Sequence, residues 1–418
     1  MEGCEKIYSD LEFDADNYRR VGEMEWTPLP ISEAEYQLAV EAIQRRARQI
    51  AGVEWHTIGD VPRNGGFFSA GMTINGVPYS SVKELDKFIG HEVSFYTFLT
   101  AAQNSRSVLY TENVALSPYH GMNCASYYGT VCSMAVNYAL GFNVPYESSM
   151  YANLPFIQKV EKQNPSSVKV GDILWRKGHV VMVEDVVRDK DGSISRVDIL
   201  ESAGSYTKIR TYTLSSFTQR WKESSWVLYR YLDFKRILEQ DEIPFLSSFR
   251  SDNYSVNYTS AICPNRGDRA CYREGEDVVL NVLQFYNGVV IVQKDGCEFK
   301  RMRCSGKEDI VLSGLTAGKY VVILSEGQIN CSFEVLQTTV LAKKVSSGIL
   351  VSFESVNGLP ESLTLCSSIG ARKFIHEFTE TERIDGGVII PGDFYNIYVK
   401  VKFRGEFGRV SNEAIHIL

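Results

Sequence analysis

The chain has 418 residues and a formal net charge of −7, with 44% hydrophobic and 23% charged residues. That length predicts two to four domains, and that composition is typical of a globular protein. The acidic balance argues against a nucleic-acid partner and against attraction to an anionic membrane surface. No apolar run approaches the roughly 20 residues that cross a bilayer, so we expect no membrane span.

The beginning of the chain does not predict a signal peptide. Met1 to Lys6 lacks the basic segment and the apolar core of a secretory leader. We therefore expect either a cytoplasmic protein or a mature chain whose leader has been removed. In the second case the protein belongs to the cell envelope or is secreted, and Cys4 is a candidate for lipid attachment.

The nine cysteines include no CxxC pair, so the sequence predicts neither a zinc site nor a complete disulfide framework. In an oxidising compartment Cys263 could pair with Cys271, or Cys297 with Cys304 across a hairpin. Buried free thiols are the alternative. We expect no metal and no organic cofactor.

The N-terminal third of the chain carries helical patterns. Ser32 to Glu35 is a capping box, apolar residues then recur at helical spacing as far as Ile50, and Gly52 supplies the stop. Further helices are expected over residues 81–89 and 95–102.

After residue 172 the period changes from helical to alternating. Successive apolar runs predict strands, and Asp189 to Gly192 predicts a hairpin turn between two of them. Helices followed by an antiparallel sheet are typical of an α+β domain, which we place at residues 1–237. The predicted strands cover residues 172–175, 179–187, 197–201 and 226–231.

Beyond residue 244 the sequence shows short strands and turn signals without a helical pattern. That spacing predicts two small β-sandwich domains, at residues 238–340 and 341–418. The predicted fold class is therefore an α+β domain followed by two all-β sandwich domains.

Two cysteines compete for the role of a catalytic nucleophile. A helix beginning at Cys124 would carry Gly129 and Thr130 in its second turn, where both are poor helix formers. A helix capped by Thr130 instead runs to Gly141 and places Cys132 in its first turn. There the helix dipole favours a thiolate, and free backbone N–H groups can meet an oxyanion. We favour Cys132 and keep Cys124 as the alternative.

His179 is the candidate general base, because a turn at residues 176–178 delivers it directly to an apolar strand. His120 lies in a loop shortly before the cysteines and is a weaker candidate for the cleft. A tight hairpin at Asp189 to Gly192 would bring His179 opposite Ser202 and next to Glu201. Glu201 is our choice for the residue that orients the imidazole, with Ser202 and Asp198 as the weaker candidates.

Four short motifs resemble those of the NlpC-type family of cell-wall cysteine peptidases. They span residues 74–203 and consist of Gly76-Val77-Pro78-Tyr79, Cys132-Ser133 at a helix start, Gly171-Asp172 before a strand, and Gly178-His179-Val180. The resemblance implies a papain-like α+β catalytic domain in which Cys132 is the nucleophile and His179 the base. It also implies that Tyr79 helps to bind the oxyanion, with Ser133 and Ser202 as further candidates for substrate or oxyanion contacts.

The sequence also departs from that family. Val131 stands where the family has Asp, Met134 stands where it has Gly, and a long insertion separates Tyr79 from Cys132. A carboxylate such as Glu201 as the third residue is more similar to the cysteine, histidine-dependent amidohydrolase/peptidase (CHAP) family. The chain thus resembles both families, and the resemblance implies that its β modules are immunoglobulin-like accessory domains.

From this resemblance we expect a cysteine hydrolase that cleaves amide bonds in the stem peptides of peptidoglycan or of muropeptides. The alternatives are a CHAP-like amidase, a transglutaminase-like acyl transferase, and an inactive wall-binding or adhesion protein. The sequence indicates no oligomeric state.

Overall fold

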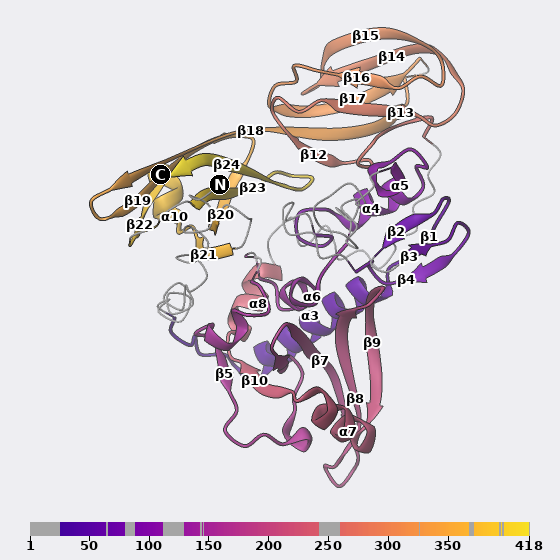
Figure 1. Cartoon of the computed structure of the whole chain (residues 1–418). Helices are drawn as coiled ribbons and strands as arrows, with labels where there is room; N and C mark the ends of the chain where they lie inside the picture. The colour runs from indigo at the N-terminus through magenta and orange to yellow at the C-terminus, as the bar shows by residue number, and fades with distance from the viewer. Residues whose placement is uncertain are drawn as a thin grey trace, which may run out of the picture.

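The computed structural model describes residues 26–63, 66–79, 88–111, 129–142, 144, 146–241, 260–325, 327–367, 372–392, 394 and 397–417. Three parts follow one another along the chain: a part with helices around an antiparallel sheet, and two β modules (Figure 1). None of the helices described is long and apolar enough to cross a membrane.

A six-stranded antiparallel sheet is the centre of the first part. Its strand order is β5-β10-β6-β7-β8-β9. The hairpin predicted at Asp189 to Gly192 is confirmed as the antiparallel pair β7–β8, whereas β9 was not predicted. The bounds are β5 (Ile157–Lys159), β6 (Ile173–Arg176), β7 (His179–Arg188), β8 (Ile194–Ala203), β9 (Tyr206–Thr213) and β10 (Val227–Tyr231).

Helices cover both faces of this sheet. On one face Val180 and Leu200 share a core with α3 (Glu33–Gly52), α6 (Cys132–Ala139) and α8 (Phe234–Asp241). On the other face, alternate residues such as Val181 pack with α7 (Leu214–Ser224). The capping box predicted for α3 is confirmed, with the Ser32 hydroxyl accepting from the backbone of Glu35 at 3.3 Å.

Short elements connect α3 to α6. Two two-stranded sheets pair β1 with β4 and β2 with β3. The predicted helix at residues 95–102 is confirmed as α4. The helix expected at residues 81–89 lies mostly outside the described residues. The bounds are β1 (Glu54–His56), β2 (Val61–Arg63), β3 (Gly66–Phe68), β4 (Thr73–Asn75), α4 (Phe95–Ala102), α5 (Val108–Thr111), η3 (Tyr151–Asn153) and η4 (Pro165–Ser167).

The middle module is a two-sheet sandwich around its own core. One sheet has the order β11-β13-β16, and the other contains β15-β14-β17-β18 with β12 paired in parallel to β18. The bounds are β11 (Ile262–Pro264), β12 (Ala270–Arg273), β13 (Val278–Val282), β14 (Tyr286–Lys294), β15 (Cys297–Gly306), β16 (Ile310–Leu312), β17 (Gly318–Leu324) and β18 (Ile329–Val345).

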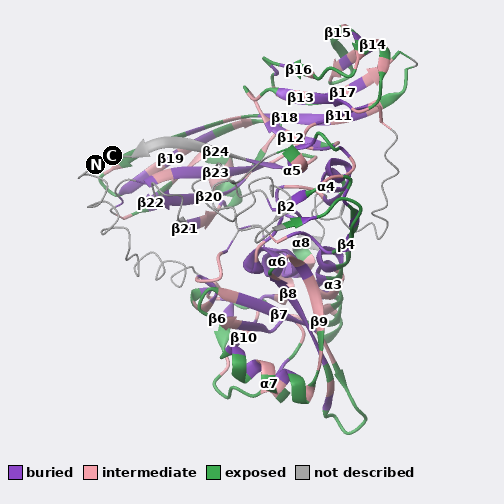
Figure 2. Ribbon diagram, turned by 45° about the vertical axis from the view of Figure 1, so that its right-hand side comes forward, coloured by how far each residue is buried: buried purple, intermediate pink, exposed green. Residues whose placement is uncertain are grey.

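The last module is a second sandwich, with a separate core. Its sheets are β18-β19-β22 and β21-β20-β23-β24, and Figure 2 shows the buried residues of β20 and β23 at its centre. The bounds are β19 (Gly348–Val356), β20 (Leu359–Ser367), β21 (Arg372–Glu377), α10 (Glu380–Asp385), β22 (Gly387–Pro391), β23 (Ile397–Arg404) and β24 (Arg409–Ile417).

A single strand, β18, belongs to both modules. Its first part pairs with β17 and β12 as far as Leu336, and its second part pairs with β19 from Gln337 onward. The predicted domain boundary at residue 340 therefore falls inside this strand, and the one at residue 237 falls inside α8.

Strands dominate the part of the chain that the structure describes, in which 46% of the residues are in strands and 21% in helices. The predicted class, an α+β papain-like domain followed by two sandwiches, is therefore wrong, and the chain reads as all-β. The physical reason is that the helical patterns yield mostly short helices. Apart from α3, no helix in the described ranges exceeds the 11 residues of α7, whereas each part is built around β-sheets.

Candidate active site

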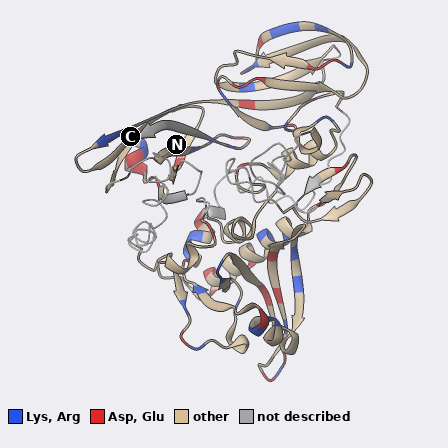
Figure 3. Cartoon of the chain, viewed as in Figure 1, with Lys and Arg blue, Asp and Glu red and all other residues tan. Residues whose placement is uncertain are grey.

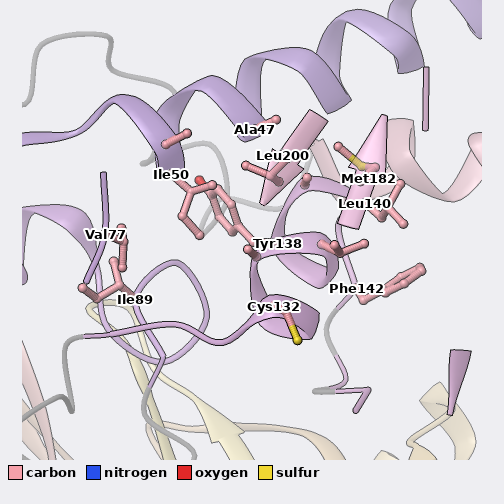
Figure 4. Close-up of a cluster of buried hydrophobic side chains, with 14 of the residues drawn as sticks. Ala47, Ile50, Val77, Ile89, Cys132, Tyr138, Leu140, Phe142, Met182 and Leu200 are labelled. Atoms are coloured by element: carbon pink, nitrogen blue, oxygen red, sulfur yellow. The ribbon is translucent and has the colours of Figure 1, made fainter. Parts of the chain in front are cut away.

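Cys132 is the first residue of α6. The N-cap is Val131, whose side chain cannot cap, and the expected capping hydrogen bond from Thr130 does not form. The first-turn N–H groups are therefore not used by a capping side chain, and they favour negative charge at this end of the helix. Cys132 is 7% exposed. Its sulfur points away from Ile50 and Tyr138, which pack behind the helix (Figure 4).

His179 is the first residue of β7 and pairs with Arg176 across the β6–β7 turn. Gly178 adopts a φ of +77° in that turn, a conformation that glycine tolerates best. The imidazole lies close enough to Cys132 for the thiol to raise the pKa of the ring, and its Nε2 lies 3.1 Å from Glu201 Oε1. With Nε2 directed to Glu201, Nδ1 is the nitrogen left for the thiol.

Glu201 lies on β8, with a side chain that is 3% exposed. Besides His179 it binds Arg210 of β9, and Arg220 of α7 lies 3.8 Å away. Figure 3 shows acidic positions on β8 beside basic positions on β9. Burial raises the pKa of Glu201, but the hydrogen bond from His179 and the charge of Arg210 outweigh burial and lower it to about 2. The carboxylate is thus ionised at neutral pH.

The register of the sheet explains why Glu201 rather than Ser202 meets the imidazole. Met182 pairs with Leu200, one residue away from the pairing that a tight turn predicts. The turn causes this shift, because the Asp189 N–H donates to Ser193 O at 2.8 Å and the loop therefore holds one residue more than a tight turn over Asp189 to Gly192. The two irregularities further along the ladder cancel each other. Because side chains alternate along a strand, the shift puts Glu201 on the face of His179 and turns Ser202 to the opposite face.

The protonation of His179 follows from its two partners. Burial lowers the pKa of the imidazole, but the hydrogen bonds to Cys132 and Glu201 outweigh burial and raise it to about 9. The ring is therefore an imidazolium at neutral pH. A positive charge beside the sulfur is the setting in which a cysteine acts as a nucleophile toward a carbonyl carbon.

This shift predicts a loss of stability at alkaline pH. The pKa of His179 rises from 6.5 to about 9 on folding. The contribution of the charged imidazole to the free energy of unfolding is therefore fully present below pH 6.5 and is lost as the pH rises through 9. The loss amounts to about 3 kcal/mol in the free energy of unfolding. Urea denaturation from neutral to alkaline pH measures it. A His179→Gln variant with the same pH slope as wild type would contradict the assignment.

Tyr79 is half-buried and lies near the sulfur. Burial and the negative charge of Cys132 raise the pKa of its hydroxyl, which therefore stays protonated and can donate a hydrogen bond. Its backbone N–H donates to Ser205 O at 2.8 Å, and Tyr79 bridges to Thr130. The motif residue is thus held between the β8–β9 turn and the segment leading to Cys132.

Gly76 explains the first position of that motif. Its φ is +99°, and a Cβ there would lie 2.0 Å from Thr207 O. The close approach lets Val77 accept from the backbone of Thr207 at 2.8 Å and so brings Tyr79 to the site.

Gly76→Ala should therefore lower the free energy of unfolding by about 3 kcal/mol, since it adds a backbone clash to the strain of a positive φ. Gly71→Ala is the matched control, because Gly71 has a φ of +83° and open space around it. It should cost only about 1 kcal/mol. Equal losses in chemical denaturation would show that the contact with Thr207 is unimportant.

The structure places the two candidate serines in the packing around α6. Ser202 is 1% exposed; its hydroxyl donates to Thr130 O at 3.3 Å and accepts from Thr207 at 3.0 Å. Ser133 is 4% exposed, and its carbonyl accepts from the Tyr151 hydroxyl at 3.1 Å. Ser202 thus supports the segment before the nucleophile, while Cys124 and His120 lie outside the described residues.

Sequence reasoning missed Arg210, Arg220 and Tyr151. Alternation along β9 from Lys208, which pairs with Glu201, could have indicated Arg210. Arg220 depends on how α7 packs, and Tyr151 on how a 3-10 turn packs against α6, which no local pattern predicts. In the ranges that the structure describes, no group of three or more His, Cys, Asp or Glu side chains could hold a metal ion.

No family model matches the chain, and no curated protein matches it. Similar solved structures include the CD2-binding domain of CD58, with 10% identity, 35% of this chain and 96% of that chain covered, and a TM-score of 0.20. Fibronectin(III)-like modules of CbhA from Clostridium thermocellum are 11% identical, with 37% of this chain and 91% of that chain covered and a TM-score of 0.19. Domains 3 and 4 of rat CD4 are 9% identical, with 36% of this chain and 98% of that chain covered and a TM-score of 0.23. These are immunoglobulin- or fibronectin-type modules, and scores this low carry no functional argument.

Proposed function

We propose that this protein is a cysteine hydrolase that cleaves amide bonds in the stem peptides of peptidoglycan. The observation that carries the proposal is the row formed by Cys132, His179 and Glu201, in which the imidazole lies beside the thiol and Nε2 is hydrogen-bonded to the carboxylate. It combines a thiol at a helix N-terminus, an imidazolium with a pKa of about 9, and a buried carboxylate that orients the ring. Such a row is the arrangement that acyl transfer through a thioester requires.

The reaction follows from these positions. The Cys132 thiolate attacks the amide carbon, and the first-turn N–H groups of α6 together with Tyr79 stabilise the oxyanion. His179 gives its proton to the leaving nitrogen as the C–N bond breaks, which leaves a thioester on the sulfur. Water then attacks the thioester while His179 removes its proton, and the peptide acid and the thiol are released. Glu201 keeps the imidazole in one orientation throughout.

The substrate class rests on the motifs shared with the NlpC-type family. The Gly76 to Tyr79 motif supports this assignment, because its folded backbone carries Tyr79 to the nucleophile. A peptidoglycan substrate implies action in the cell envelope or outside the cell.

Mass spectrometry of peptidoglycan digested by the full chain tests the proposal, since it identifies both the bond and the reaction. Wild type should release peptides with a new carboxylate and a new amine, and Cys132→Ala should release none. Incorporation of an added amine in place of water would indicate an acyl transferase. The absence of any product, together with a Cys132 thiol that does not react with iodoacetamide at about pH 6, would favour a binding protein.

A further inference from the structure

The turn at residues 88–93 lies between the catalytic helix and the last β module. Gly90 adopts a φ of +86° against the ring of Tyr138 of α6, where a Cβ would lie 2.8 Å from the ring. On the other side, the backbone N–H of Arg409 donates to Glu92 O at 3.2 Å. A Cβ on Gly408 would lie 2.9 Å from the same carbonyl. The β23–β24 hairpin therefore rests directly on this turn, and Figure 1 shows it reaching toward α4 and α6.

His91 connects the turn to the nucleophile helix. Its Nε2 lies 3.2 Å from Met134 O, in the first turn of α6, and its ring packs edge-on against Tyr138. Burial and the charges of Lys402 and Arg409 lower the pKa of His91 to about 3. The ring is therefore neutral, and Nε2 carries the proton that it donates to the Met134 carbonyl.

Buried ion pairs hold the hairpin against this turn. Lys402 binds Glu92, with side chains that are 5% and 2% exposed. Arg409 binds the carbonyl of His91 and also reaches Glu361 through two nitrogens, at 2.5 and 3.2 Å. Every charge in this junction cluster (Glu92, Glu361, Lys402 and Arg409) thus has an opposite charge as a partner, as buried ions require.

The contacts form a continuous path from the last module to the nucleophile. Arg409 fixes the backbone of His91, and the His91 ring fixes the carbonyl of Met134, two residues after Cys132. The only other side-chain donor recorded on the first-turn carbonyls among the described residues is Tyr151, on Ser133. Two side chains therefore set the lateral position of this turn, and one of them depends on the last module.

We propose that the last β module positions the nucleophile: through Arg409 and His91 it holds the first turn of α6 so that Cys132 meets His179. The inference rests on the proposed function, and it assigns His91 and Arg409 as positioning residues. If the β23–β24 hairpin left the turn, Cys132, His179 and Glu201 would all still be present, but Cys132 would be displaced from His179. A misplacement of about 1 Å can reduce the rate by about 100-fold.

Two variants of His91 provide the sharpest test, made in the full chain with peptidoglycan as substrate. His91→Phe keeps a ring against Tyr138 but loses the donor, whereas His91→Gln keeps an N–H at the position of Nε2. We expect kcat to fall by roughly 10- to 100-fold in His91→Phe with little change in KM, and to return to within about threefold of wild type in His91→Gln. Equal loss in both variants would overturn the role of the donor.

The ion pairs are tested by removing both charges together. Arg409→Met combined with Glu361→Gln should reduce kcat about as much as His91→Phe. Lys319→Met is the matched control, because Lys319 forms an exposed pair with Glu406 at the tip of the same hairpin; it should leave kcat unchanged. If the double variant keeps the kcat of wild type, the module does not position the nucleophile. If the double variant does not fold, the comparison of His91→Phe with His91→Gln alone tests the positioning role.

A second measurement separates this inference from the proposed function. The rate of Cys132 alkylation by iodoacetamide, followed on its own peptide by mass spectrometry, needs no substrate. It should fall in His91→Phe and in the double variant, and recover in His91→Gln. If wild type cleaves nothing, the proposed function fails, but this order of alkylation rates still supports the positioning role. Identical rates in all variants would overturn it.

Discussion

His179→Ala is expected to reduce kcat for peptide hydrolysis by about 10⁴-fold. The imidazole takes part in both halves of the reaction, since it protonates the leaving nitrogen and then activates water. Its loss also removes the positive charge beside the sulfur, so alkylation of Cys132 at about pH 6 should slow as well. Steady-state kinetics on muropeptides and mass spectrometry of the alkylated peptide measure the two effects.

His376→Ala is a matched control for this variant. His376 forms another His–Glu pair, with Nε2 2.9 Å from Glu382, in the last module. Its removal should leave kcat and alkylation unchanged. If His179→Ala retained more than about a tenth of wild-type activity, His179 would not be the base.

Glu201→Gln is expected to reduce kcat by about 100-fold or more, although an amide has nearly the same shape as the carboxylate. The amide can no longer stabilise the imidazolium, and it can hold the wrong tautomer. The pKa of His179 should fall from about 9 toward its ordinary value, because Glu201 is one of the two groups that raise it. NMR titration of the imidazole measures this fall directly.

The same variant should lower the free energy of unfolding by about 2 kcal/mol, because a buried group loses charge-assisted hydrogen bonds. Arg210 and Arg220 can turn to solvent, since their side chains are 41% and 37% exposed, which limits the loss. Glu298→Gln, which breaks an exposed pair with Arg301, should change neither stability nor kcat. An unaltered pKa of His179 in Glu201→Gln would contradict the role given to the carboxylate.

Much of the site could be read from the sequence because it depends on local patterns. Cys132 opens a short helix and His179 opens a strand, and both positions follow from periodicity and turn residues. The choice of Glu201 was reached from a register that is wrong by one residue. A turn that closes on Ser193 instead of Gly192 caused that error, and the turn residues alone do not predict the length of the loop.

The fold class was harder to predict, because helical periodicity does not give helix length or the share of strand in the whole chain. The segment after Phe234 is rich in charged residues, yet it forms α8, whose apolar residues such as Ile237 pack against α3. Likewise, the junction cluster joins residues about 300 positions apart, as in Lys402 and Glu92. Neither contact leaves a pattern within a short window of sequence.

The strand shared by the two β modules makes them one mechanical unit. The residues of β18 pass from one ladder to the next at Leu336 and Gln337 with no unpaired residue between. Seventeen residues of strand form a beam of roughly 55 Å. A rotation of one sandwich relative to the other would require backbone hydrogen bonds of β18 to break. A force applied to one module is therefore transmitted through the strand to the other, which a flexible linker would not do.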